Sequence, residues 1–399
     1  MLNYNDAKAL IQTSNPDEPV TLIRPHAAKR AAQYFVQNFP GKSLYAVKAN
    51  PSPELLKTLW DNGITHYDVA SIGEVRLVKS LLPDAEICFM HPVKSERTIA
   101  ESYHEHGVRT FSLDTLDELS KIMRATDNAD DLHLCVRIRV SSKYSEISLA
   151  AKFGAEADEV AALLMASRQN AAKLGICFHV GSQAMTPLAY SDAMEHVRAA
   201  IVEASVTVDV VNVGGGFPSS YPGMEPPSLG HYFELIDTSF EDLPISYSAE
   251  LWCEPGRALC AEYASLVVKV EKRRGDELFI NDGAYGALFD AAHIDWRFPV
   301  EYIAADGKAS DAEYNAFSFY GPTCDDMDYM KGPFHLPSDI KTGDYIEIGL
   351  LGAYGCAMRS GFNGFEAGET HIAHDNPMST LYGAESDIDR DNVISLPSS

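Results

Sequence analysis

The stretch SLYAVKANPS, residues 43–52, decides the fold because a short apolar run leads directly into Lys48 and then into a turn. A lysine is rarely fully buried unless it is paired or chemically used, although at a strand end it can also extend to solvent. The next residues, SPELLKTLWDNG, supply Ser52 as a candidate N-cap, Pro53 at the first helical position and Gly63 as a stop. We therefore predict a buried strand, a lysine at its end and a helix.

The same pattern of a strand followed by a helix recurs along the chain. Eight strand candidates lie at residues 43–47, 64–70, 85–90, 109–113, 132–140, 174–180, 208–213 and 245–254. Helical patterns separate them, and such alternation predicts a parallel sheet. Eight units in this length favour an α/β fold of the (β/α)8 TIM-barrel type. An open doubly wound sheet is the alternative.

The sequence pattern changes after about residue 255, where short runs of alternating apolar and polar residues replace the helical stretches. These runs lie at residues 263–282, 298–304, 315–321, 344–351 and 353–359. The first reads as two strands around a turn at Arg274-Gly275. We predict a second, all-β domain, resembling a sandwich or barrel, and expect residues 19–25 to add a strand to it.

Two domains follow from these patterns. We predict that residues 24–258 form the barrel, and that residues 1–23 plus 259–399 form the β-domain. The segment from about Glu366 is polar and acidic, so we expect an acidic tail that is partly disordered.

Composition narrows the classes of partner. The net charge of −25 argues against nucleic acid and anionic membrane surfaces, which both need a basic footprint. No run of 18 apolar residues occurs, so no transmembrane helix is expected. The seven cysteines include no CxxC pair, which suggests neither a disulfide framework nor a metal site. The N-terminus lacks a signal-peptide pattern, and a reducing cytoplasm is the expected location.

Polar residues gather at the predicted strand ends, where the active site of such a barrel lies. These positions hold Lys48, Asp68, Ser71, His91, Arg137, His179, Gly181, Ser182, Gly214, Gly215, Gly216, Glu254 and Arg257. Singly, each has an ordinary structural explanation: Ser71 with Glu74, for example, matches a capping box. Together they suggest one site, because the strand interiors stay apolar.

The chemistry of this set points to pyridoxal phosphate. The glycine-rich turn at residues 214–216 offers backbone amides to an anion, and Arg257 can add a bidentate contact. Lys48 can form a Schiff base, and Glu254 can keep a pyridinium nitrogen protonated. No role can be assigned to His91.

Eight motifs, in order, carry a family resemblance: YAVKAN, HYDVAS, FHVGS, NVGGGFP, CEPGR, YGPTCDDMD, LGAYG and FNGF. Over residues 20–365 the chain resembles the fold-type III, alanine-racemase-like pyridoxal-phosphate enzymes of the ornithine/diaminopimelate/arginine decarboxylase family. The resemblance implies a barrel plus a β-domain that includes the N-terminal strand. It also implies a head-to-tail homodimer with shared active sites.

The resemblance implies a role for each matching residue. Lys48 would form the Schiff base, Glu254 would pair with the pyridinium nitrogen, and His179 would stack on the ring. Cys324 would protonate Cα across the dimer. The cofactor would also contact Asp68, Ser71, Arg137, Ser182, Gly215, Gly216, Gly256, Arg257 and Tyr354. The substrate would contact Asp290, Asp325, Tyr285 and Phe362.

The implied reaction is decarboxylation of L-ornithine to putrescine, since an acidic pocket suits a substrate with a second amine. L-Lysine, or both substrates, is the first alternative, because one methylene is worth only ~1–3 kcal/mol of discrimination. Diaminopimelate is disfavoured because Asp325 would repel its distal carboxylate. Arginine is disfavoured because arginine decarboxylases of this family are expected to be longer.

Two further alternatives keep the fold but change the function. A racemase is disfavoured by Glu254, because racemases of this fold typically set an arginine against the pyridine nitrogen. A catalytically inactive regulator is disfavoured because such a protein should have lost Lys48, Asp68 or Cys324.

Overall fold

Eight parallel strands close into a barrel in the computed structural model, which describes residues 1–149 and 151–382. The strands are β3 (Lys42–Ala46), β4 (His66–Val69), β5 (Glu86–Phe89), β6 (Thr110–Leu113), β7 (His133–Arg137), β9 (Lys173–Cys177), β11 (Val210–Asn212) and β12 (Glu250–Cys253). Each overlaps one predicted strand. The barrel prediction is confirmed, and the open-sheet alternative is wrong.

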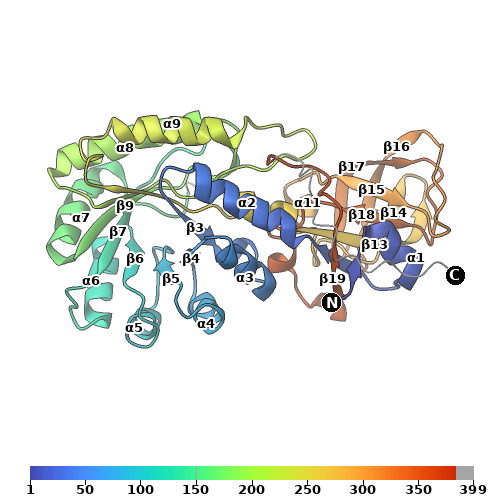
Figure 1. Ribbon diagram of the computed structural model, residues 1–399, viewed down its shortest axis with the longest axis horizontal. Helices are drawn as coiled ribbons and strands as arrows, with labels where there is room; N and C mark the ends of the chain where they lie inside the picture. The colour runs from blue at the N-terminus through green and yellow to red at the C-terminus, as the bar shows by residue number, and fades with distance from the viewer. Residues whose placement is uncertain (150, 383–399) are drawn as a thin grey trace.

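Helices surround the barrel at one end of the molecule (Figure 1). They are α2 (Pro25–Asn38), α3 (Pro53–Asp61), α4 (Ile72–Leu81), α5 (Glu96–His104), α6 (Leu116–Ala125), α7 (Ala157–Asn170), α8 (Leu188–Ala204) and α9 (Leu229–Glu241). One face of α3 is apolar and buried, with Leu55, Leu56 and Leu59 fully inaccessible. Ser52 occupies the N-cap, but its side chain makes no capping hydrogen bond.

The inside of the barrel is packed with side chains, as expected for this architecture. A distinct buried cluster from the strands comprises Leu44, Cys88, Met90, Cys135, Cys177, Val210 and Trp252. Because this core fills the interior, polar groups concentrate at the carboxyl ends of the strands and in the segments that follow them.

A nine-stranded sheet occupies the other end of the molecule (Figure 1). Its main order is β1 (Asn3–Tyr4), β19 (Thr370–Ala373), β2 (Val20–Ile23), β13 (Ala264–Arg274), β14 (Glu277–Ile280), β16 (Tyr314–Tyr320) and β17 (Tyr329–Pro337). Strand β18 (Tyr345–Ile348) pairs with β13 and β15 (Val300–Ile303). As predicted, β2 joins this sheet by pairing antiparallel with β13, and β13 and β14 form a hairpin.

The remaining elements are short. They are α1 (Ala7–Ser14), β8 (Ser145–Ile147), β10 (Ser182–Ala184), α10 (Arg257–Cys260), α11 (Phe289–His293) and the 3-10 helices Val47–Ala49, Ala261–Tyr263, Cys356–Met358 and Phe362–Gly364. Among the described residues, no helix is long and apolar enough to cross a membrane.

Two sequence predictions differ from the structure. Residues 353–359 were expected to form a β-run, but they form turns and the Cys356–Met358 helix. The polar segment from Glu366 was assigned to a tail, but β19 within it pairs in parallel with β2. Local alternation does not reveal a strand whose partner lies some 350 positions earlier. The acidic stretch after residue 382 lies outside the described residues.

Candidate active site

A cavity of about 320 Å³ opens at the carboxyl ends of the barrel strands. Five of the predicted site residues line it: Lys48, Asp68, Arg137, His179 and Glu254. They come from five different strand ends, so closure of the barrel is what brings them together.

Lys48 lies in the 3-10 turn that directly follows β3. Its side chain is 44% exposed, and Nζ lies 3.4 Å from Oδ2 of the buried Asp68. The Asp68 carboxylate raises the pKa of Lys48 and outweighs the opposing effect of burial. The lysine is therefore neither buried nor loose: it is held by one carboxylate and open to a ligand in the cavity.

Glu254 follows β12 and is buried. Its Oε1 accepts a hydrogen bond of 2.7 Å from Nδ2 of Asn212. Burial, followed by the nearby Asp68 carboxylate, raises the pKa of Glu254 to about 8. Such a group favours a cationic partner, because a nearby positive charge offsets the cost of ionising it in a buried site.

His179 follows β9, and its Nδ1 accepts a 3.0 Å hydrogen bond from the amide of Gly181. That bond places the proton of the neutral imidazole on Nε2. Burial, Arg137 and Lys48 lower the pKa of His179 well below its usual value. The ring is therefore a neutral aromatic surface at the cavity wall.

The glycine run after β11 forms a close-packed cradle. Gly214 and Gly216 have φ of +68° and +106°, in the left-handed region that favours glycine. A Cβ at Gly215 would lie 2.8 Å from the carbonyl oxygen of Glu254 and 3.0 Å from Nε2 of His179. No side chain fits there, so the backbone of the run can approach a ligand directly.

Arg257 stands beside this cradle with unused hydrogen-bonding capacity. Its Nη2 lies 3.5 Å from Ser182 Oγ and its Nη1 donates to Tyr221 Oη at 3.1 Å, while its buried Nε has no partner among the described residues. The guanidinium also lies 5.0 Å from the ring of Tyr354. A buried arginine with an unpaired nitrogen next to a glycine cradle fits a phosphate group.

Gly256 and Ser71 have structural duties near the site. A Cβ at Gly256 would lie 3.1 Å from that of Ala49, so this glycine lets the segment after β12 approach the Lys48 turn. Ser71 caps α4 by accepting from the amide of Glu74, and Glu74 accepts from the amide of Ala70 at 2.6 Å. The Ser71 half of the capping box predicted from the sequence is therefore present, whereas Glu74 binds the amide one residue before the N-cap; Ser71 does not line the cavity.

Four other predicted residues gather away from Lys48. Tyr285 Oη donates to Asp325 Oδ2 at 2.5 Å, and its ring lies 4.7 Å from that of Phe362. The amide of Cys324 donates to Asn363 Oδ1 at 3.1 Å. Cys324 and Phe362 are exposed, and none of the four lines the Lys48 cavity. We call Cys324, Asp325, Tyr285 and Phe362 the thiol cluster.

Asp290 neither lines the Lys48 cavity nor belongs to the thiol cluster. Its Oδ2 lies 3.8 Å from Nη2 of Arg257, and its side chain is 15% exposed. Burial raises its pKa, and Arg257 opposes that shift. Asp290 therefore adjoins the guanidinium of Arg257.

Sequence reasoning missed Asn212 and Phe153. Asn212 lies two residues before the glycine run, separated from it by Val213, and its position at the end of β11 was the available signal. Phe153 lines the cavity from the segment between β8 and α7, which has no strong periodicity. Its ring is packed against His91 and the guanidinium of Arg137.

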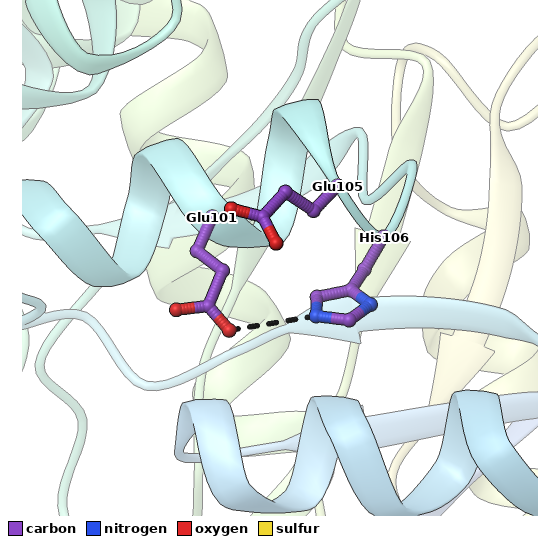
Figure 2. A group of neighbouring side chains, drawn as sticks. All are labelled: Glu101, Glu105 and His106. Carbon is purple, nitrogen blue, oxygen red and sulfur yellow. Dashed lines mark ion pairs between the residues drawn. The ribbon is translucent and has the colours of Figure 1, made fainter.

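A group of possible metal ligands lies elsewhere, at the end of α5. Glu101, Glu105 and His106 place ligand atoms within 4.8 Å of one another (Figure 2). Glu101 already binds the guanidinium of Arg76 at 2.6 Å. Because this arginine neutralises Glu101, we assign no metal to the group.

Comparison with known proteins identifies relatives across nearly the whole chain. The family model described as "Pyridoxal-dependent decarboxylase, pyridoxal binding domain" matches residues 26–261. A lysine/ornithine decarboxylase of Selenomonas ruminantium is 32% identical, covering 86% of this chain and 87% of the relative. An ornithine decarboxylase of Schizosaccharomyces pombe is 31% identical, covering 86% and 78%.

Solved structures of decarboxylases are also similar to this chain. The lysine/ornithine decarboxylase of Vibrio vulnificus complexed with cadaverine has a TM-score of 0.79 at 27% identity, covering 93% of this chain and 100% of that chain. The arginine decarboxylase of Paramecium bursaria Chlorella virus has a TM-score of 0.80 at 27% identity, covering 91% and 97%. That enzyme has a similar length, so the length argument against arginine decarboxylation is wrong.

Proposed function

The chain belongs to the pyridoxal-dependent decarboxylases, and we propose that it converts L-ornithine to putrescine and carbon dioxide. The observation that carries this proposal is the convergence of Lys48, Asp68 and Glu254 on one cavity beside the glycine cradle. The relatives named for ornithine support the substrate. L-Lysine is the second candidate because one relative is named for both substrates.

The residues present fit pyridoxal phosphate. The cradle at 214–216 and Arg257 would hold the phosphate, and Glu254 would hold the ring nitrogen through its carboxylate. Bound there, the cofactor supplies a ring that accepts electrons when a bond at the substrate Cα breaks. Lys48 supplies the amine that attaches it, and Asp68 orients that amine.

Three residues prepare the site for charge. Glu254 would pass its proton to the ring nitrogen and pair with it as a carboxylate, because that ion pair would offset the burial that otherwise keeps Glu254 protonated. The neutral His179 offers a flat surface to one face of the ring. Arg137 adds a positive charge at the cavity wall.

We also propose that the site is completed by a second copy of the chain. The thiol cluster, in which Cys324 and Phe362 are exposed, does not line the Lys48 cavity, although its residues suit the reaction. Cys324 would hold the proton that Cα receives after carbon dioxide leaves, since a positioned thiol can act as a general acid. Asp325, whose pKa is lowered by the hydroxyl of Tyr285, would bind the distal ammonium.

We also propose the limits of the two domains and a reducing cellular compartment. The division into 24–258 and 1–23 plus 259–399 is supported by β2 lying in the large sheet and β3 to β12 in the barrel. A reducing compartment is supported by the absence of disulfides among the seven cysteines, all of which lie in the described residues.

The alternative of a regulator rests on one relative. Antizyme inhibitor 2 of Xenopus laevis is 30% identical, and the match covers 83% of this chain and 75% of the length of that protein. Against that reading, this chain retains Lys48, Asp68 and Cys324.

A substrate panel tests the proposal. Carbon dioxide release by the cofactor-loaded protein should be measured with L-ornithine, L-lysine, L-arginine and meso-diaminopimelate. We expect L-ornithine to have the highest kcat/KM. A higher kcat/KM for L-lysine or L-arginine would change the assigned substrate but would still support decarboxylation. If none of the four amino acids releases carbon dioxide, the racemase or regulator alternatives would be favoured.

A further inference from the structure

His91 is a cavity residue that the proposed function leaves without a task. It follows β5, lines the same cavity as Lys48 and Glu254, and is half-buried. No described residue accepts a hydrogen bond from its Nε2, whereas its other ring nitrogen is engaged.

The hydrogen bonds of His91 fix its tautomer. Nδ1 accepts a 3.0 Å hydrogen bond from the amide of Val93, so the proton of the neutral ring sits on Nε2. His179 on the far side of the barrel uses the same device, with Nδ1 accepting from the amide two residues later. Burial, then Lys94, Lys152, Arg137 and Lys48, lowers the pKa of His91 and keeps the ring neutral.

The turn that carries His91 is anchored by a buried lysine. Lys94 Nζ donates to the carbonyl oxygens of His91 at 2.9 Å and of Ser112 at 2.6 Å. The same ammonium pairs with the buried Glu118 at 3.1 Å. The backbone at His91 is thus held in place before any ligand arrives, which is the condition for a preorganised donor.

Phe153 brings this donor and Arg137 to one place. The His91 ring packs edge-on against Phe153 with centroids 5.0 Å apart, and the Arg137 guanidinium lies 5.4 Å from the same ring. Among the residues that the structure describes, neither the His91 nor the Arg137 side chain hydrogen-bonds to another side chain in the cavity. The two carboxylates there are engaged elsewhere, Asp68 with Lys48 and Glu254 with Asn212.

We infer that His91 is a binding residue that, alongside Arg137, donates a hydrogen bond from Nε2 to an anionic oxygen of the ligand in this cavity. This inference rests on the proposed function. Two sources can supply such an oxygen: the ring hydroxyl group of pyridoxal phosphate and the α-carboxylate of the amino-acid substrate.

Two variants of equal size isolate the donor. In His91→Asn the side-chain oxygen can still accept from the amide of Val93 while the NH2 group donates into the cavity. In His91→Asp the oxygen can still accept, but no donor remains and a negative charge faces the cavity. Both lose the ring contact with Phe153 equally, so the loss of that packing alone would affect them alike.

The first measurement is the Kd of pyridoxal phosphate for the cofactor-free variants, read from visible absorbance without turnover. The second compares the KM of L-ornithine with inhibition by putrescine, which lacks the carboxylate, on the loaded enzymes. Loss of a hydrogen bond to a charged group should change the affected constant by about tenfold or more.

If the oxygen belongs to the cofactor, His91→Asp weakens pyridoxal phosphate binding while His91→Asn stays close to wild type. If it belongs to the substrate, cofactor binding is unchanged, KM rises in His91→Asp alone, and putrescine inhibition is unaltered. Equal constants for the two variants in both measurements would overturn the inference. Carbon dioxide release by wild-type protein in the same preparation reports separately on the proposed function, and the cofactor measurement does not depend on it.

Discussion

Lys48 is held by a single buried carboxylate at the edge of an open cavity, so its side chain is positioned to meet a ligand bound there. We predict that Lys48→Ala loses the covalent attachment of pyridoxal phosphate and nearly all decarboxylation. Lys152→Ala, which changes another lysine lining the cavity, should keep the attachment. Borohydride reduction followed by peptide mass spectrometry locates the labelled lysine. Label at any position other than 48 would refute the assignment.

The raised pKa of Glu254 makes a prediction about pH. The folded, cofactor-free protein keeps this proton up to a pKa of about 8, whereas the unfolded chain releases it near the ordinary value of 4.5. The contribution of a raised pKa to stability is complete below the unfolded value and is lost as pH rises through the folded value.

Relative to Glu254→Gln, the wild-type free energy of unfolding should therefore fall as pH rises between these two values. For one proton the slope is at most about 1.4 kcal/mol per pH unit. Denaturant titrations of both proteins at several pH values measure the difference. Parallel curves would mean that Glu254 is already ionised in the folded protein.

Five residues of the cavity could be predicted from the sequence, because each sits at the end of a recognisable strand: Lys48, Asp68, Arg137, His179 and Glu254. It could not locate Phe153 or the partner of Glu254, since side-chain contacts across the barrel depend on closure. Ser71 shows the reverse case: its capping role was readable locally, and the structure places it outside the cavity wall.

In the proposed function, the glycine cradle at residues 214–216 is the element that would hold the phosphate. Gly215→Ala should weaken pyridoxal phosphate binding by about tenfold or more, because its Cβ would meet the carbonyl of Glu254 and the His179 ring. Gly230→Ala in α9 is a matched control, since its nearest atoms lie at 3.8 Å. Equilibrium titration with the cofactor measures both. Equal affinities would show that the cradle does not contact the phosphate.

The elements that could be predicted share a clear local signal. The barrel strands are apolar runs followed by amphipathic helices, and their neighbours are close in the sequence. By contrast, β1, β8, β10 and β19 have two to four residues each, and their pairing partners are distant. Their hydrogen bonds join segments that are far apart in the sequence, so periodicity alone did not reveal them.

At the scale of the whole molecule, the separation of the thiol cluster from Lys48 is tested by mixing two inactive proteins. If each site takes Lys48 from one chain and Cys324 from the other, Lys48→Ala and Cys324→Ala proteins should recover about a quarter of wild-type activity. Random exchange makes half of the dimers mixed, and each mixed dimer has one intact site of two. Carbon dioxide release measures the recovery. No recovery, with subunit exchange shown by mass spectrometry, would contradict a shared site.

Cofactor-dependent decarboxylation is tested most simply by measuring carbon dioxide release from L-ornithine before pyridoxal phosphate is removed, after it is removed, and after it is restored. We predict that release stops when the cofactor is removed, returns when it is restored, and yields one putrescine for each carbon dioxide. Absence of carbon dioxide from every amino acid in the panel, with the cofactor attached at Lys48, would contradict the assignment as a decarboxylase.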